Sequence, residues 1–268
     1  MRIDLGPLTA LVALIVGVFR ARWLTQRFGV ALVYGVICHT VFAIAVGAMV
    51  AMMFFGLSES FGRVPRPWSW LANLALVLQF PLAHSFLLGP RGRRILANLA
   101  PDPHGQTLGT TVYAIIASVQ LAALFLLWTP SGVIWWQAEG AVFWTVCLAY
   151  ALAWLLLGWA SIDAGAEVQS GALGWMSLAQ GQRPRFPDMP VSGLFAVIRQ
   201  PIYVSFALTL WTVPVWTPDQ LMLAAVLTLY CVLAPRFKER RWARSYGDRF
   251  RAYQRAVPYM VPGWGRSH

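Results

Sequence analysis

The sequence predicts an all-α integral membrane bundle, on the basis of its composition, its apolar stretches and the placement of its basic residues. The chain has 268 residues, of which 58% are hydrophobic and 12% charged, and its mean hydropathy is +0.59. Soluble domains carry about 25% charged residues. The composition therefore excludes most soluble folds, and it also excludes disorder, which requires low hydrophobicity. The length suits one bundle, so we expect a single membrane domain over 1–268.

Seven apolar stretches are candidates for crossing the membrane: 7–19, 28–57, 67–89, 107–128, 138–162, 201–215 and 219–235. A crossing helix needs ~20 apolar residues, and the first stretch and the last two are short. The first is followed by Arg20 and Arg22, where a signal-peptide cleavage site would lie, so we interpret it as a membrane segment. The last two are separated by Trp216-Thr217-Pro218-Asp219, a turn sequence, and predict a tight helical hairpin. We therefore expect six to seven transmembrane segments.

The basic residues support this set of crossings and predict its orientation. With seven crossings, the loops at 20–27, 90–106 and 163–200 and the tail from 236 onward share one side and hold 18 of the 21 Lys and Arg residues. Because Lys and Arg concentrate on the cytoplasmic side, we expect a cytoplasmic C-terminus, in a bacterial inner membrane. The same bias explains the net charge of +11, so no nucleic-acid partner is expected.

The cysteines predict neither a disulfide framework nor a metal site. Cys38, Cys147 and Cys231 lie far apart inside apolar runs and form no CxxC pair. We interpret them as small buried hydrophobic residues.

The tail predicts an amphipathic helix at the membrane surface. Its apolar face is formed by residues spaced 4, 4, 3 and 4 apart, namely Trp242, Tyr246, Phe250, Tyr253 and Val257. Six Arg residues, from Arg240 to Arg255, accompany them, as in helices that contact anionic membrane lipids. A Gly in a helix interior costs about 1 kcal/mol relative to Ala. We therefore expect Gly247 to mark either a break in the helix or the close approach of another segment.

The segment from Arg199 to Pro258 resembles the isoprenylcysteine carboxyl methyltransferase superfamily of membrane enzymes. The family pattern is Arg-His-Pro-x-Tyr, a short hydrophobic hairpin, Glu-Glu, spaced aromatic residues and Val-Pro. The matching residues here are Arg199-Gln200-Pro201-Ile202-Tyr203, Lys238-Glu239, Trp242, Tyr246-Gly247, Phe250, Tyr253 and Val257-Pro258. Two positions depart from the pattern: Gln200 replaces the His, and Lys238 replaces the first Glu.

The middle of the chain adds a second, weaker resemblance. Asn73-Leu74-Ala75-Leu76, Ala83-His84-Ser85 and Thr110-Thr111-Val112-Tyr113 look like the bacterial methanethiol S-methyltransferase branch of this superfamily. The same region also looks like NnrU-type membrane proteins.

The resemblance implies methyl transfer from S-adenosylmethionine to a small thiol or another lipophilic acceptor. The 163–268 part, following the transmembrane helices of 1–162, would hold the cofactor in its cytoplasmic loop, hairpin and tail. The implied catalytic residues are Arg199 and Tyr203. The implied cofactor-binding residues are Arg199, Gln200, Pro201, Tyr203, Glu239 and Tyr246.

Three of these roles have a clear chemical reason. Tyr203 would offer an aromatic wall to the cationic sulfonium. Glu239 would bind the ribose hydroxyls or the amino group, and Arg199 would pair with a carboxylate. No Gly-rich nucleotide fingerprint of the G-x-G-x-x-G kind is present.

The alternative function is that of a non-catalytic or haem-associated NnrU-like protein. Counted from the cytoplasmic ends of their helices at 1.5 Å per residue, His39 lies ~17 Å deep and His84 ~7 Å deep. Two ligands of one haem iron would have to lie at similar depth, so a haem site shared by both is disfavoured. We expect both to be hydrogen-bonded structural residues, while His84 alone stays open as a haem ligand or substrate contact. The loop at 180–188 is either a lid over the pocket or a linker.

Overall fold

The computed structural model describes residues 6–263, and nearly all of its regular structure is helical. Arg2 and Arg266, which the charge count above includes, lie outside the described residues. In chain order the elements are α1 (Gly6–Phe19), α2 (Gln26–Phe54), α3 (Trp68–Leu87), α4 (Pro90–Asn98), α5 (Gly105–Leu126), β1 (Trp136–Gln137), α6 (Gly140–Asp163), α7 (Ala166–Gln169), α8 (Ala172–Gln180), the 3-10 helix η1 (Gly193–Ala196), α9 (Pro201–Trp211), β2 (Val215–Trp216), α10 (Pro218–Tyr246) and α11 (Asp248–Ala256).

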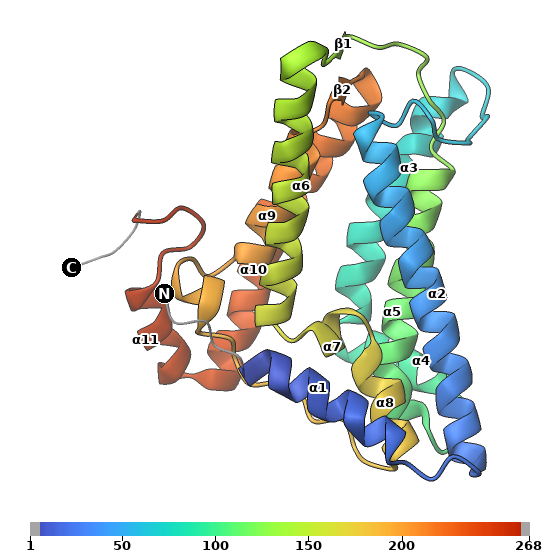
Figure 1. The fold of residues 1–268 in the computed structure, drawn as a ribbon, viewed down its shortest axis with the longest axis vertical. Coiled ribbons are helices and arrows are strands. Elements are labelled where there is room, and N and C mark those ends of the chain that lie inside the picture. Colours follow the sequence, from blue (N-terminus) through green and yellow to red (C-terminus); the bar gives the residue numbers. More distant parts are fainter. Residues whose placement is uncertain (1–5, 264–268) are drawn as a thin grey trace.

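Within the described range, five helices are long and apolar enough to cross a membrane: α2, α3, α5, α6 and α10. They extend along the long axis of the molecule in Figure 1, and the 11-residue α9 packs between α6 and α10. This arrangement confirms the predicted all-α membrane bundle. The division of one domain into 1–162 and 163–268 stays a prediction.

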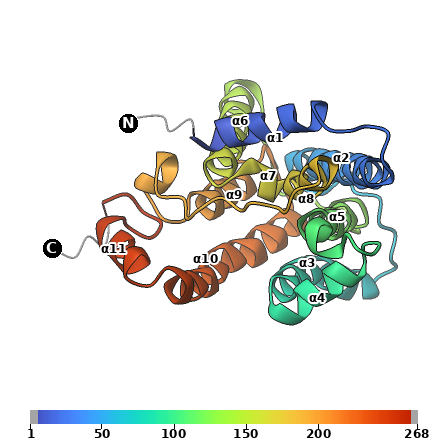
Figure 2. The same cartoon turned by 90° about the horizontal axis from the view of Figure 1, so that it is seen from below.

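The first apolar stretch forms a helix, α1, but this helix lies across the end of the bundle (Figure 1). Seen from below, it passes α6, α7 and α8 (Figure 2), and Gln180 on α8 donates a hydrogen bond to the carbonyl of Leu14 at 3.0 Å. Fourteen residues make a helix of ~21 Å, which is short for a hydrocarbon core of ~30 Å. The structure therefore corrects the expectation that 7–19 is a crossing, and six apolar helices remain for the bundle.

The terminal hairpin turns where the sequence predicted it. The Thr217 hydroxyl caps α10 by accepting a hydrogen bond from the backbone N–H of Gln220 at 3.0 Å. Asp219, buried in the first turn, accepts bonds from the Trp128 indole at 2.9 Å and the Ser131 N–H at 2.8 Å. The two-residue strands β1 and β2 pair antiparallel beside it. The turn is thus fastened to the loop that precedes α6.

The last apolar stretch and the start of the tail form one helix, because α10 continues to Tyr246. Gly247, at φ +54°, ends it, and α11 follows in a new direction. The single tail helix expected from the aromatic spacing is therefore wrong, whereas the predicted break at Gly247 is confirmed. The apolar face still packs together around the corner: the rings of Trp242 and Phe250 lie 5.8 Å apart, beside buried Met189.

The buried apolar side chains form separate clusters along the molecule. One surrounds Phe125, Trp128 and Leu223 near the paired strands. Another lies at the opposite end and includes Leu87 and Leu96, which also line the cavity described below.

Candidate active site

The hairpin brings the motif residues from both of its ends together. Gln200, the residue before α9, donates a hydrogen bond to Glu239 on α10 at 2.8 Å. Tyr203, in the first turn of α9, lies with its ring centre 5.4 Å from the Nζ atom of Lys238. Residues about forty positions apart in the sequence therefore form one site at the end of the bundle that carries α11.

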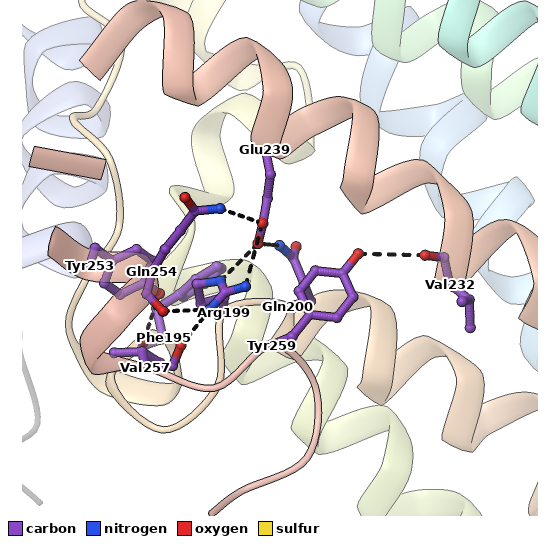
Figure 3. A network of polar contacts seen from close by, with 9 residues as sticks. All are labelled: Phe195, Arg199, Gln200, Val232, Glu239, Tyr253, Gln254, Val257 and Tyr259. Carbon is purple, nitrogen blue, oxygen red and sulfur yellow. Dashed lines mark hydrogen bonds and ion pairs between the residues drawn. The ribbon is translucent and has the colours of Figure 1, made fainter. Parts of the chain in front are cut away.

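Glu239 is the centre of a network of polar contacts (Figure 3). Its carboxylate accepts hydrogen bonds from Arg199 Nε at 2.9 Å, from Gln200 Nε2 at 2.8 Å and from Gln254 Nε2 at 2.8 Å. Arg199 also donates to the carbonyl oxygens of Gln254 at 2.9 Å and Val257 at 2.6 Å. The network therefore joins the segment before α9, the end of α10 and α11.

The ion pair in this network is largely shielded from solvent, since the side chains of Arg199 and Glu239 are only 13% and 12% exposed. A buried ion pair is stable only when its remaining donors and acceptors are satisfied, as they are here by Gln200 and Gln254. Gln200 stands where the family has His, and it supplies the carboxylate with the hydrogen-bond donor that this position needs.

Two tyrosines attach the tail to the same region (Figure 3). The Tyr253 hydroxyl donates to the carbonyl of Phe195 at 2.6 Å, and burial raises the pKa of Tyr253, so it stays a neutral donor. The Arg199 guanidinium lies 5.4 Å from the ring centre of Tyr259, whose hydroxyl reaches the carbonyl of Val232 at 3.5 Å. The tail is thus held against η1, the segment before α9, and α10.

A cavity of about 660 Å³ lies next to this network, between α2, α3, α5 and α10. Its apolar part includes Phe42, Phe80 and Leu121. Its polar part includes Tyr203 from the motif and His84 on α3. Such a concave, mostly apolar space with a few polar groups is typical of small-molecule sites.

Lys238 lies at the junction of the cavity and the network. Its Nζ atom is 4.6 Å from the ring centre of Trp242, 5.4 Å from that of Tyr203 and 5.9 Å from that of Phe195. Aromatic faces attract cations at such distances. The three rings therefore form a site for a positive charge, which the Lys238 ammonium approaches in this structure.

The structure places the predicted site residues in two groups. Tyr203 lines the cavity. The other five do not line it; they are Arg199, Gln200, Pro201, Glu239 and Tyr246. Pro201 begins α9, and Tyr246 packs edge-on against Trp242. Their predicted contacts with a cofactor stay predictions.

The two membrane histidines have different surroundings. His39 accepts a hydrogen bond from the Trp175 indole at 3.0 Å, which confirms its structural interpretation. His84 lies between the rings of Phe80 and Tyr113. Its Nδ1 atom is shielded from solvent and has no hydrogen-bond partner within the described part of the chain. His84 is thus available to a ligand in the cavity.

Several cavity residues were missed or given another role by the sequence analysis. Arg93 and Arg241 line the cavity, although they were counted only as basic loop and tail residues. The spacing of Lys238 and Arg241, three positions apart on one helix face, is the signal that could have found the second. Pro184 and Phe186 of the loop after α8 also line it.

The chain is similar in sequence to several known proteins. The chain is 24% identical to methanethiol S-methyltransferase 1 of Bradyrhizobium diazoefficiens, with 89% of this chain and 84% of that protein covered. It is 27% identical to methanethiol S-methyltransferase of Mycobacterium tuberculosis, with 88% and 97% covered. It is also 25% identical to Nurim of Xenopus laevis, with 68% and 69% covered.

No family model matches the chain, and no solved structure matches it. The similarity to several methyltransferases nevertheless extends over most of the chain. The predicted resemblance to the bacterial branch of the isoprenylcysteine carboxyl methyltransferase superfamily is thereby confirmed, and by that similarity the chain is a membrane methyltransferase.

Proposed function

We propose that the protein transfers a methyl group from S-adenosylmethionine to a small thiol within the cavity beside α10. The observation that carries the proposal is the position of Tyr203, because this motif residue lines a cavity of about 660 Å³ that extends into the bundle. The relatives named methanethiol S-methyltransferase support the reaction class and the thiol.

The residues of the cavity suit such a cofactor. The ring of Tyr203, which lines the cavity, and those of Phe195 and Trp242, which lie beside it, already surround the Lys238 ammonium. A sulfonium is attracted to aromatic faces in the same way. The unpartnered, shielded atoms His84 Nδ1 and Thr110 Oγ1 offer hydrogen bonds to a bound molecule. When bound, this donor would supply a methyl group for attack by a thiolate. The bond between the methyl carbon and the donor sulfur breaks as the bond to the acceptor sulfur forms, its electron pair goes to the donor sulfur, and the thiol proton goes to solvent.

The chain contributes orientation and exclusion of water. The apolar lining around Phe42, Phe80 and Leu121 keeps bulk water away from the reacting atoms. Alignment of two bound reactants can contribute about 7–11 kcal/mol to lowering the barrier of a bimolecular displacement. A thiol needs only partial ionisation, so the reaction requires no dedicated base.

We further propose that Arg199, Gln200 and Glu239 position the site. Their network fixes the start of α9 and the end of α10 relative to each other, and therefore fixes Tyr203 against Lys238. The family resemblance implies that Arg199 and Glu239 contact the cofactor directly. For such contacts, groups of the cofactor would have to replace some of the hydrogen bonds that these two side chains make within the protein.

The orientation belongs to the same proposal. We infer that the end of the bundle bearing α4, α8 and α11 faces the cytoplasm of a bacterial cell, since most basic residues lie in its loops and tail. A fluorescent-protein fusion at the C-terminus tests this orientation. Such a fusion should fluoresce, and an alkaline phosphatase fusion at the same point should be inactive.

The test of the function is S-adenosylmethionine binding to the purified protein in detergent, measured by calorimetry, followed by thiol methylation. We expect micromolar affinity and at least a tenfold loss in Tyr203→Leu. Tyr34→Leu is the matched control, because Tyr34 lies outside the cavity and its hydroxyl reaches only the carbonyl of Leu99. Absence of binding in folded protein, together with a haem absorbance band, would favour the haem alternative.

A further inference from the structure

The cavity has a marked charge imbalance at its open end. Among the described residues that line it, three are cationic and none is acidic. The cations are Arg93 on α4 and Lys238 and Arg241 on α10. Arg93 and Arg241 are exposed, whereas Lys238 is half-buried.

Among the described residues, these cations make no direct ion pair with a carboxylate, although the charge of Glu239 acts on Lys238 through space. Within residues 6–263, none of the three has an ion-pair partner. Glu239 adjoins Lys238 in sequence, but its carboxylate is occupied by Arg199, Gln200 and Gln254. The imbalance is therefore a property of the cavity and not of an incomplete ion pair.

The methyl donor does not correct this imbalance. S-adenosylmethionine has a carboxylate, an ammonium and a sulfonium, so it carries one net positive charge at neutral pH. Like charges brought together in a partly desolvated site repel each other. Binding both reactants is therefore favoured when the second one brings negative charge.

The inner part of the cavity adds a requirement for an apolar stem. The lining follows α5 from Gly105 to Leu121, which is ~24 Å of helix. Phe42, Phe80 and Leu121 line the part farther along these helices, away from the cations. One end of the cavity thus suits an acid group, and the other suits a hydrocarbon chain.

We propose that the preferred methyl acceptor is a small thiol that carries an acid group on an apolar stem, with the acid held by Arg93, Lys238 and Arg241. This inference rests on the proposed function, whose substrate it specifies. Arg binds carboxylates through a rigid fork of donors, and two Arg side chains and one Lys side chain line this cavity.

The test compares three thiols of equal length, namely 6-mercaptohexanoate, 6-mercaptohexanol and 6-aminohexanethiol, as acceptors for the purified full chain in neutral detergent. We expect the KM of the acid to be about tenfold below that of the alcohol, and the amine to be the poorest of the three. In the double variant Arg93→Gln/Arg241→Gln, the ratio of the KM of the alcohol to the KM of the acid should fall at least fivefold. The matched control Arg94→Gln/Arg240→Gln removes two exposed neighbours that do not line the cavity and should keep it.

Equal KM values for acid and alcohol, or the same loss of preference in the control variant, would overturn the inference. Calorimetric binding of the three thiols without donor separates it from the proposed function. If no thiol is methylated but the acid binds, and binding is lost in Arg93→Gln/Arg241→Gln, the proposed function fails and only the assignment of the acid-binding end of the cavity stands. If methylation proceeds and the alcohol binds as tightly as the acid, the function stands and the inference fails.

Discussion

Two adjacent residues of α10 face regions of opposite character. Glu239 points into a closed network in which every bond to its carboxylate comes from the protein. Lys238 points toward an open cavity whose cations have no ion-pair partner among the described residues. Two adjacent motif positions can therefore have different roles. Glu239 connects segments of the protein, and Lys238 lines the cavity in which we propose that the ligands bind.

Removing the Glu239 carboxylate should have the largest effect on stability. In Glu239→Ala, Arg199 keeps its burial but loses its counter-charge, which costs about 3 kcal/mol. The melting temperature in detergent should fall by roughly 10 °C. Glu59→Ala, which removes an exposed carboxylate, is the control and should melt like the parent. Equal melting of both variants would mean that the network does not hold the tail.

Tyr253→Phe should have an intermediate effect on the same network. It removes the donor to the buried carbonyl of Phe195 at 2.6 Å, so the unfolding free energy should fall by about 1–2 kcal/mol. Tyr259→Phe, which removes a 3.5 Å contact to Val232, should cost less. The reverse order in thermal melts would contradict this view of how the tail is attached.

Lys238→Met sharpens the contrast on the side of the cavity. It replaces a half-buried cation with an apolar side chain of similar length, so stability should stay within about 1 kcal/mol of the parent. S-adenosylmethionine should bind about fivefold more tightly, because the aromatic rings of Tyr203 and Trp242 become free for its sulfonium. Calorimetry measures this change. Weaker binding would mean that Lys238 assists the cofactor.

The smallest effect is expected at the surface pair of Asp188 and Arg249, whose atoms lie 2.6 Å apart. The hydrogen bond from Arg249 lowers the pKa of Asp188 below its ordinary value. The pair therefore stabilises the fold above pH ~4, the ordinary value, and this contribution disappears as pH falls through the lowered pKa. Melts of Asp188→Asn should differ slightly from the parent at pH 7 and coincide with it at pH 2. A difference that persists at pH 2 would exclude this cause.

The long helices were predictable because their apolar runs are about as long as a membrane crossing requires. The hairpin followed from Pro218 and Asp219, and the corner from Gly247. The path of α1 was not predictable, because a short run that is apolar on all sides does not distinguish a buried helix from one that lies across a bundle. Its packing on α8 decides the matter.

The proximity of the motif residues was predictable, but the way they pair was not. The motif identified Arg199, Tyr203 and Glu239 as neighbours, and the hairpin explains why. The sequence could not reveal that Arg199 and Glu239 satisfy each other. The carboxylate of Glu239 also accepts a bond from Gln254, which lies on α11 beyond the turn at Gly247. Arg93 comes from a distant helix, and no local pattern connects it to α10.

The fastening of Asp219 to Trp128 and Ser131, together with the pairing of β1 and β2, has a mechanical consequence. These bonds make the far end of the hairpin a fixed pivot for α9 and α10. Any widening of the cavity then has its greatest amplitude at the basic end, where α10 extends beyond the bundle (Figure 2). We therefore expect substrates to enter and products to leave the cavity at its basic end.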